Sequence, residues 1–426
     1  MGLTLFKNVL VFDGTGSDPF PGEVSVQGNR VQSVAKGKDQ IPTDGATVVD
    51  GGGATIMPGL CEAHGHISYN DCAKLSEIGD IPPEEHTLLT AYNAKLLLGM
   101  GFTSVYSAAS SKPRLEVAVR DEINSGRIPG PRFKAASPEI VSTGGLGDER
   151  QYHMHHESVG MIADGPDEIR KLVRLMVRER VDTIKINISG DNFTETCRAE
   201  MLSYTDEEVG AAAEVAHSRG VWLACHARSD DSVRLALKHN FRVIYHADFI
   251  TNETIDMVEA KKDEIFLAPA VGAIYATAYE ASEWGITPEI ADKVMDLPRK
   301  LEHTERVYRE MRKRGVRVLP GGDYGFAWTP MGTNSRDLEH FVKMFGYTPA
   351  EVLMAATKWG GEIMGMGDEL GLLKTGYLAD MIMIDGDPVK DITLFQNKDN
   401  ILMVMKDGEY FVEPRPGRAK VHQKAA

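Results

Sequence analysis

The chain has 426 residues, more than the roughly 100–200 of an ordinary single domain, and a globular composition with 42% hydrophobic and 26% charged residues. Its formal net charge of −15 argues against nucleic-acid and acidic-membrane partners, because both require basic patches. The sequence shows no signal-peptide pattern, no run of about 18 apolar residues and no CxxC spacing among its four cysteines. We therefore expect a cytoplasmic protein with reduced thiols.

Both ends of the chain have the pattern of short strands. The first 55 residues alternate polar and apolar side chains between Gly, Pro and Asn, and the C-terminal segments GYLADMIMIDGDP and NILMVMKDGEYFV repeat this character. We predict a small β-sandwich domain assembled from residues 1–55 and 367–426. The remaining domain, residues 56–366, lies between them.

The middle of the chain alternates short apolar runs with amphipathic helical patterns, one of which opens with a capping box at Thr205. This alternation predicts an α/β fold, a (β/α)8 TIM barrel, with a doubly wound open sheet as the alternative that no GxGxxG or Walker loop supports. The eight candidate strands are residues 55–66, 102–108, 131–137, 182–190, 221–227, 242–248, 264–270 and 316–323.

Side chains that bind metals occur at the ends of these candidate strands. His64 and His66 end the first strand, and their spacing of two places both on one face. His226 and His246 end the fifth and sixth strands, where a histidine packed in the core is the alternative. Asp323 follows two glycines at the end of the eighth strand, where a carboxylate can bind metal and accept a proton.

Lys185 lies in the middle of DTIKINISG, among residues that should be buried. A buried lysine is costly to charge, so it either extends its ammonium to solvent, pairs with a carboxylate or, with a depressed pKa, reacts with CO₂ to form a carbamate. Because the carboxyl ends of barrel strands meet at one face, this lysine and the five strand-end residues are expected to converge. Histidine, lysine and aspartate residues scattered through a core would not be expected to recur in this way along successive candidate strands.

These motifs resemble those of the amidohydrolase superfamily, specifically its binuclear members with a bridging lysine, over nearly the whole chain. MPGLCEAHGH is similar to the family's strand-one motif, KINISG to its strand-four lysine motif and GGD at 321–323 to its strand-eight aspartate. TGGLGD and TIKINISGD are closest to the imidazolonepropionase-like and Xaa-Pro or Xaa-Arg dipeptidase-like branch. Two positions depart from that branch: Leu146 stands where a histidine is expected, and Ala247 follows His246 where glycine is frequent.

The resemblance implies two divalent metal ions, with zinc as the default and manganese or cobalt as alternatives. The implied ligands are His64, His66 and Asp323 for the more buried metal, His226 and His246 for the second, and Lys185, carboxylated by CO₂, as the bridge. A hydroxide shared by the two metals would attack the carbonyl carbon, and Asp323 would pass its proton to the leaving nitrogen.

Several other residues are weaker candidates for substrate binding. Arg228, two residues past His226, is a candidate clasp for a substrate carboxylate, with a surface salt bridge as the alternative. The HMHH run at 153–156, beginning with His153, is interpreted as a loop or lid, with substrate or metal binding as alternatives. Core packing is the alternative for the tyrosines that lie near strand ends, Tyr69, Tyr152 and Tyr324.

The resemblance predicts hydrolysis of an amide-type C–N bond in a small molecule, with an N-acyl amino acid or a dipeptide as the favoured substrate. A cyclic amide, a carbamate, a urea or an amide-bearing xenobiotic is the alternative. Deamination and decarboxylation are more remote, since deaminase relatives lack the lysine that Lys185 provides. A non-catalytic scaffold is the alternative of another class, and it would be expected to have lost ligands. Relatives of this kind also suggest a homo-oligomer.

Overall fold

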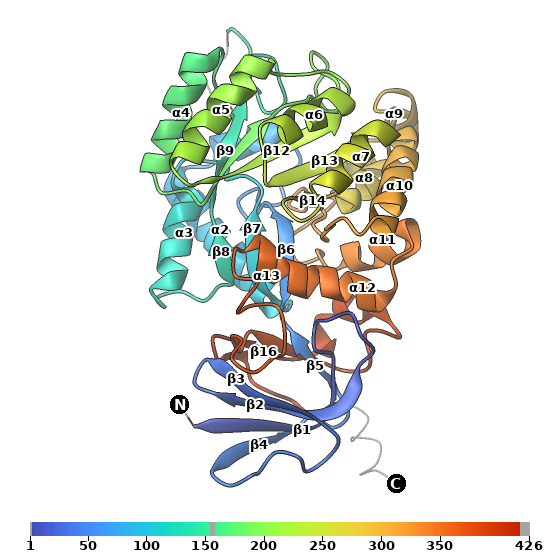
Figure 1. The fold of residues 1–426 in the computed structure, drawn as a ribbon. Helices are drawn as coiled ribbons and strands as arrows, with labels where there is room; N and C mark the ends of the chain where they lie inside the picture. The colour runs from blue at the N-terminus through green and yellow to red at the C-terminus, as the bar shows by residue number, and fades with distance from the viewer. Residues whose placement is uncertain (1, 154–157, 418–426) are drawn as a thin grey trace.

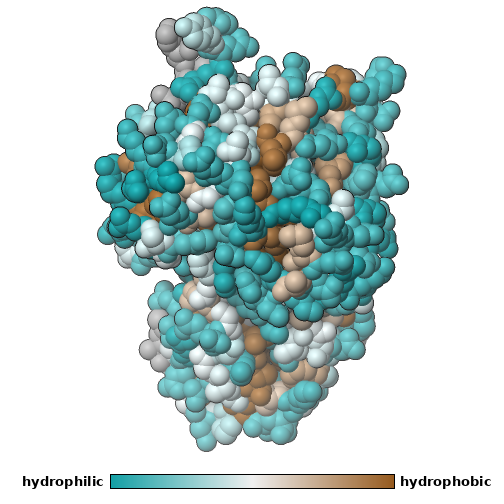
Figure 2. Space-filling model, turned by 45° about the horizontal axis from the view of Figure 1, so that its top comes forward, coloured by the Kyte–Doolittle hydropathy of each residue, from teal (hydrophilic) through white to brown (hydrophobic). Residues whose placement is uncertain are grey.

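The structure is a computed structural model that describes residues 2–153 and 158–417. Figure 1 shows a larger part covered by helices and, below it, a smaller part made mainly of strands. Figure 2 shows hydrophilic side chains over most of one face, with apolar side chains gathered in a strip across the helix-bearing part. Among the described residues, no helix combines the length and hydropathy needed to cross a bilayer.

The smaller part contains one hydrogen-bonded sheet that draws strands from both ends of the chain. Its order is β17-β16-β15-β5-β1-β2-β3, with β4 paired to β1. The central strand β5 pairs with β1 in parallel and with β15 antiparallel, so it joins the two ends. The strands are β1 (Leu3–Val11), β2 (Phe20–Gln27), β3 (Arg30–Lys36), β4 (Ala46–Asp50), β5 (Thr55–Pro58), β15 (Met381–Ile384), β16 (Ile401–Lys406) and β17 (Glu409–Val412).

This sheet matches the expectation of a β unit built from both termini, but its hydrogen bonding does not separate two layers. The predicted sandwich is therefore not shown, and the boundaries at residues 55 and 367 stay a prediction. One apolar cluster, which includes Phe6, Val24, Ile56, Met381 and Met403, fills the interior of this part. These buried side chains recur along β1, β2, β5, β15 and β16, consistent with one face of the sheet turned inward.

The larger part contains two parallel sheets. One has the order β6-β7-β8 and the other β10-β9-β11-β12-β13-β14. Most of these strands are buried along their whole length, as expected for parallel strands covered by helices. The strands are β6 (Leu60–Gly65), β7 (Phe102–Ser107), β8 (Arg132–Lys134), β9 (Ala136–Val141), β10 (Met161–Ile162), β11 (Thr183–Asn187), β12 (Trp222–Ser229), β13 (Val243–Phe249) and β14 (Phe266–Ala268).

The predicted closed barrel differs from this arrangement at two places. The third candidate strand is divided at Ala135 into β8, which pairs with β7, and β9, which pairs with β11. The eighth candidate, residues 316–323, forms no named strand; it makes a single parallel bridge between Val318 and Leu267 of β14. Pro320 has no N–H, and its carbonyl accepts only a long hydrogen bond of 3.4 Å from Ala63 of β6.

Helices cover the parallel sheets, and five of those in the described residues, α5, α6, α7, α9 and α12, start at a capping Ser or Thr side chain. The predicted capping box is confirmed: the Thr205 side chain accepts from the N–H of Glu208, whose carboxylate accepts from the N–H of Thr205. The helices are α1 (Leu75–Asp80), α2 (Pro83–Gly99), α3 (Leu115–Asn124), α4 (Pro166–Arg178), α5 (Asp206–Ser218), α6 (Asp230–Lys238), α7 (Asn252–Ala260), α8 (Val271–Tyr279), α9 (Pro288–Lys293), α10 (Leu297–Lys313), α11 (Arg336–Phe345), α12 (Pro349–Met354) and α13 (Gly360–Ile363).

Candidate metal centre and its cavity

Four histidines from three strands meet inside the larger part. His64 lies in β6, His66 directly after it, His226 in β12 and His246 in β13, and each is between 1% and 3% exposed. The ring centroids of His226 and His246 are 4.3 Å apart, and those of His64 and His246 are 5.2 Å apart. The structure therefore brings together imidazoles that lie up to about 180 residues apart in the sequence.

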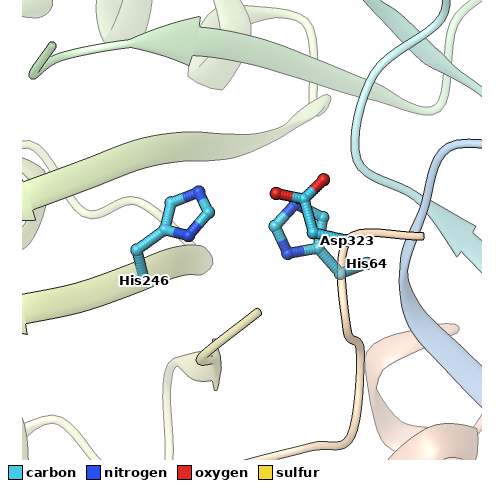
Figure 3. Close-up of side chains that lie close together, drawn as sticks. All are labelled: His64, His246 and Asp323. Atoms are coloured by element: carbon cyan, nitrogen blue, oxygen red, sulfur yellow. The ribbon is translucent and has the colours of Figure 1, made fainter. Parts of the chain in front are cut away.

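The Asp323 carboxylate belongs to the same cluster. Its Oδ1 lies 3.1 Å from Nε2 of His66 and 3.7 Å from Nε2 of His64. One ligand atom from each of His64, His246 and Asp323 lies within 4.8 Å of the others, and Figure 3 shows His246 facing the other two across a common space. Burial opposes ionisation of this carboxylate, but the two neighbouring histidines outweigh burial and hold the pKa of Asp323 well below its usual value.

Several buried ring nitrogens in this cluster have no hydrogen-bond partner among the described residues. They are both nitrogens of His64 and the Nδ1 atoms of His66 and His246. Burial, more than any nearby charge, lowers the pKa of His64 and His246 well below the ordinary value and that of His226 to about 3. The three rings are therefore neutral, which is the form of imidazole that binds a metal.

The backbone at two of these residues is in the left-handed region. His246 has a φ of 76° and Asp323 a φ of 62°. Such conformations are uncommon for residues other than glycine and gather at functional sites, where the surrounding structure imposes them. At His246 the Tyr308 hydroxyl donates a 2.6 Å hydrogen bond to the backbone carbonyl, which helps to hold this conformation.

Lys185 projects from β11 beside the histidines and is 1% exposed. Its Nζ lies 3.5 Å from Oε1 of Glu139 and 4.8 Å above the ring of Tyr245, which stacks on His64. Glu139 is the register partner of Lys185 on β9, so both side chains lie on the same face of neighbouring strands. Sequence reasoning missed Glu139, because the third strand was expected to end at residue 137, two residues before it.

Arg228 is buried within an ionic network and is not a free side chain. It donates from Nε to Asp191 at 2.5 Å and from a terminal nitrogen to Asp248. Asp191 also lies 3.5 Å from Nε2 of His226. Arg228 therefore forms salt bridges, as the alternative expected, but these are buried and not at the surface. They hold Asp191 beside the histidine cluster.

A cavity of about 530 Å³ opens above these side chains. All six candidate metal ligands line it, together with Glu139, Asp191 and Arg228. Another part of its lining, the wall, is apolar and aromatic: the rings of Phe326 and Trp328 stack with centroids 5.4 Å apart and an angle of 8°, and the ring centroid of Trp284 lies 6.3 Å from that of Trp328. The cavity thus joins a polar floor to an aromatic wall, as small-molecule sites commonly do.

The predicted substrate contacts differ in where they lie. Tyr69 lines the cavity and stacks on His66 with centroids 4.0 Å apart. Tyr152 and His153 are exposed, and the structure does not place them among the lining residues. Tyr324 is 1% exposed and packs against the backbone of Gly272 and Gly322, consistent with its core-packing alternative. The rest of the HMHH run, residues 154–156, lies outside the described residues.

Comparison with known proteins supports the resemblance drawn from the motifs. Ochratoxinase of Aspergillus niger is 26% identical over 384 residues, covering 85% of this chain and 76% of that protein. Imidazolonepropionase of Rubrobacter xylanophilus is 22% identical over 400 residues, covering 91% and 90%. The crystal structure of a Xaa-Pro dipeptidase with bound methionine is 25% identical, with a TM-score of 0.84 and coverage of 96% of this chain and 100% of the other.

These neighbours also bear on the predicted fold and family. The mixed α/β architecture with such neighbours is consistent with a TIM-barrel-like domain, although the ring of hydrogen-bonded strands is interrupted at the two places described above. The model of the amidohydrolase family matches residues 55–410, most of the chain. The chain therefore belongs to the amidohydrolase family.

Proposed function

We propose that the protein is a metal-dependent hydrolase that cleaves an amide-type C–N bond in a small molecule, with an N-acyl amino acid or a dipeptide as substrate. Family membership and relatives that include an ochratoxinase and a Xaa-Pro dipeptidase support a hydrolase acting on C–N bonds. The observation that carries the metal dependence is the set of buried, neutral imidazoles with unpartnered nitrogens beside the Asp323 carboxylate.

The donor set fits two divalent metals. In this proposal His64, His66 and Asp323 hold one metal, His226 and His246 hold the second, and Lys185 bridges them after carboxylation by CO₂. Imidazole and carboxylate ligands suit zinc first, with manganese or cobalt as alternatives. Nε2 of His226 lies 3.0 Å from the carbonyl of Gly190, which leaves its other ring nitrogen available as a ligand.

The metals, when bound, supply Lewis acidity that polarises the scissile carbonyl and makes water a stronger nucleophile. Asp323 is placed to accept the proton of the attacking water, since its carboxylate faces the space between the histidines. It then returns that proton to the leaving nitrogen, which departs as an amine. The aromatic wall of Phe326 and Trp328 packs against an apolar group of the substrate and keeps bulk water away from the reacting atoms.

A cyclic amide is the second candidate substrate, because one relative is an imidazolonepropionase, named for an imidazolone ring. Homo-oligomeric assembly and cytoplasmic location stay predictions. The scaffold alternative has less support, since none of the six expected ligand positions has lost its metal-binding side chain.

Metal analysis of the purified protein, combined with a panel of N-acyl amino acids, dipeptides and cyclic amides, tests the proposal. We expect about two metals per chain, loss of hydrolysis after chelation, and recovery when zinc, manganese or cobalt is restored. Hydrolysis that persists in fully metal-free protein would contradict the proposed chemistry. Failure to cleave any C–N bond in the panel with both metals bound would contradict the proposed reaction.

A further inference from the structure

A lysine that the strand-end pattern does not include lies on the cavity wall. Lys300 belongs to the first turns of α10 and is 1% exposed, yet it lines the cavity with Arg228 and Asp191. Helix α10 packs on β13, the strand that carries His246, and Thr304 one turn further on hydrogen-bonds to Asp248 at 2.9 Å. The position of Lys300 beside the metal-binding floor is therefore fixed by the packing of the helix.

The two buried cations that line the cavity, Arg228 and Lys300, differ in their hydrogen bonds. Arg228 donates hydrogen bonds to two carboxylates, Asp191 and Asp248. Among the described residues, the one carboxylate within 4 Å of the Lys300 ammonium is that of Asp191, whose Oδ1 is 3.7 Å from Nζ, beyond hydrogen-bond distance. Because Lys300 lines the cavity and its ammonium makes no hydrogen bond to a described residue, its N–H groups can donate to a polar ligand there.

The N-terminal end of α10, which carries Lys300, adds to the positive electrostatic potential in the cavity. No side chain caps the N-terminus of α10 at Asp296, and Leu297, its first residue, also lines the cavity. The first N–H groups of a helix carry a partial positive charge that favours a nearby anion. Burial first, and then the charge of Arg228, lower the pKa of Lys300 to about 8, so the ammonium form still predominates at neutral pH.

We propose that Lys300, at the N-terminal end of α10, binds the free carboxylate of the substrate, and that Arg228 holds Asp191 in place instead of contacting the substrate. This inference rests on the proposed function and names the residue that selects an acidic substrate. It changes the role first considered for Arg228, whose guanidinium already has two anionic partners.

The spacing of the wall and the floor suits an N-acyl amino acid. The Asp191 carboxylate lies near both groups: its Oδ1 is 3.7 Å from Nζ of Lys300 and its Oδ2 is 3.5 Å from Nε2 of His226. In an N-acyl amino acid, three covalent bonds of about 1.3–1.5 Å each separate the scissile carbonyl carbon from the carboxylate carbon. One end of such a molecule can therefore contact Lys300 while its amide lies above the histidines.

The test compares two ligands that differ only in the anion, N-acetylphenylalanine and its carboxamide. Binding is measured by calorimetry on the Asp323→Asn protein in excess zinc, which offsets the loss of one proposed metal ligand, and we expect its turnover to be too slow to consume either ligand. We expect the carboxylate to bind at least about tenfold more tightly than the carboxamide. Lys300→Met should reduce that preference to less than twofold, and Lys300→Arg, which keeps the charge, should restore part of it. Lys293→Met, which removes an exposed lysine, is the matched control and should leave the preference unchanged.

An unchanged preference in Lys300→Met, or no preference before the substitution, would overturn the inference. If Lys300→Met does not fold, a crystal structure of the Asp323→Asn protein with N-acetylphenylalanine decides: the carboxylate must lie within hydrogen-bond distance of Nζ, and placement on Arg228 or elsewhere overturns the role of Lys300. Different results would contradict the proposed function and the inference about Lys300. Carboxylate preference without hydrolysis of any C–N bond would contradict the reaction alone, whereas amide hydrolysis indifferent to Lys300 would contradict the inference alone.

Discussion

The floor and the wall of the cavity are built in different ways. The floor consists mainly of side chains on parallel strands, His64, Lys185, His226 and His246, whose separation is set by the spacing of the strands. The wall consists of side chains from helices and loops, such as Lys300 of α10, and of aromatic rings that pack on one another. The floor therefore supports the chemistry of a whole family, whereas the wall determines which molecule reaches it.

Asp323→Asn should give the largest effect, because it removes both a proposed metal ligand and the proposed proton acceptor of the floor. We expect kcat/KM to fall by up to about 10⁴-fold, in line with the contribution of a well-placed acid–base group. The far-UV spectrum and unfolding temperature should change little, since asparagine has nearly the same size as aspartate and tolerates the left-handed backbone of residue 323. A variant that keeps more than a tenth of the activity would contradict the assigned role.

Lys185→Ala tests whether the floor holds a pair of metals. The variant should bind about one metal per chain where the unsubstituted protein binds two, and its activity should fall by at least about 100-fold, since even partners of metal ligands contribute 10–100-fold. Metal content measured after dialysis against a weak chelator provides the readout. An unchanged content of two metals would show that Lys185 is not the bridge, and the ion pair with Glu139 would then be its role.

The difference between floor and wall also explains what the sequence could predict. His64 and His66 are recognisable because a spacing of two on a strand implies a shared face, and His226 and His246 because they follow apolar runs. Lys300 carries no such signal: LPRKLEH is an ordinary amphipathic helix pattern, and only the packing of α10 on β13 turns this lysine toward the cavity.

The errors in the predicted fold have the same origin. The eighth candidate strand has the composition of a buried strand, but the sequence does not show that Pro320 would interrupt its pairing with β6. The sandwich stays a prediction, because alternation alone does not show which strand-like segments pair with one another. Sheet order and the exact ends of strands depend on contacts between distant segments, and Glu139 was missed for this reason.

Trp284→Ala should have a moderate effect that is confined to the wall. Trp284 lines the cavity and is 42% exposed, so its removal should cost little stability. For substrates with an aromatic group we expect KM to rise by about 2–10-fold with kcat nearly constant, because an aromatic pair contributes about 0.5–1.5 kcal/mol. Tyr92→Ala, which removes an exposed aromatic residue of α2 that does not line the cavity, is the control. An equal rise in KM for substrates with a small aliphatic group would argue against contact between the substrate's aromatic group and the Trp284 ring.

Asp337→Asn should give the smallest effect on activity and a measurable effect on stability. The Asp337 carboxylate is 1% exposed and accepts hydrogen bonds from the N–H groups of Gly321, at 2.9 Å, and Gly272, at 3.1 Å. Because Gly321 lies two residues before Asp323, Asp337 supports the turn that positions the Asp323 carboxylate. An asparagine can offer only one oxygen to these two donors, so we expect a loss of about 1–3 kcal/mol in the free energy of unfolding.

The pH dependence of this loss gives an independent check. Burial raises the pKa of Asp337 from 3.8 to about 7, so the folded chain binds this proton more tightly than the unfolded chain does. The stability that the proton contributes is fully present below the unfolded pKa of about 4 and is lost as the pH rises toward 7. Denaturant unfolding of both proteins between pH 5 and pH 8 should therefore show the difference between them shrinking as the pH rises. A difference that grows over this range would mean that Asp337 is ionised in the folded protein, and that its two N–H donors outweigh the cost of burial.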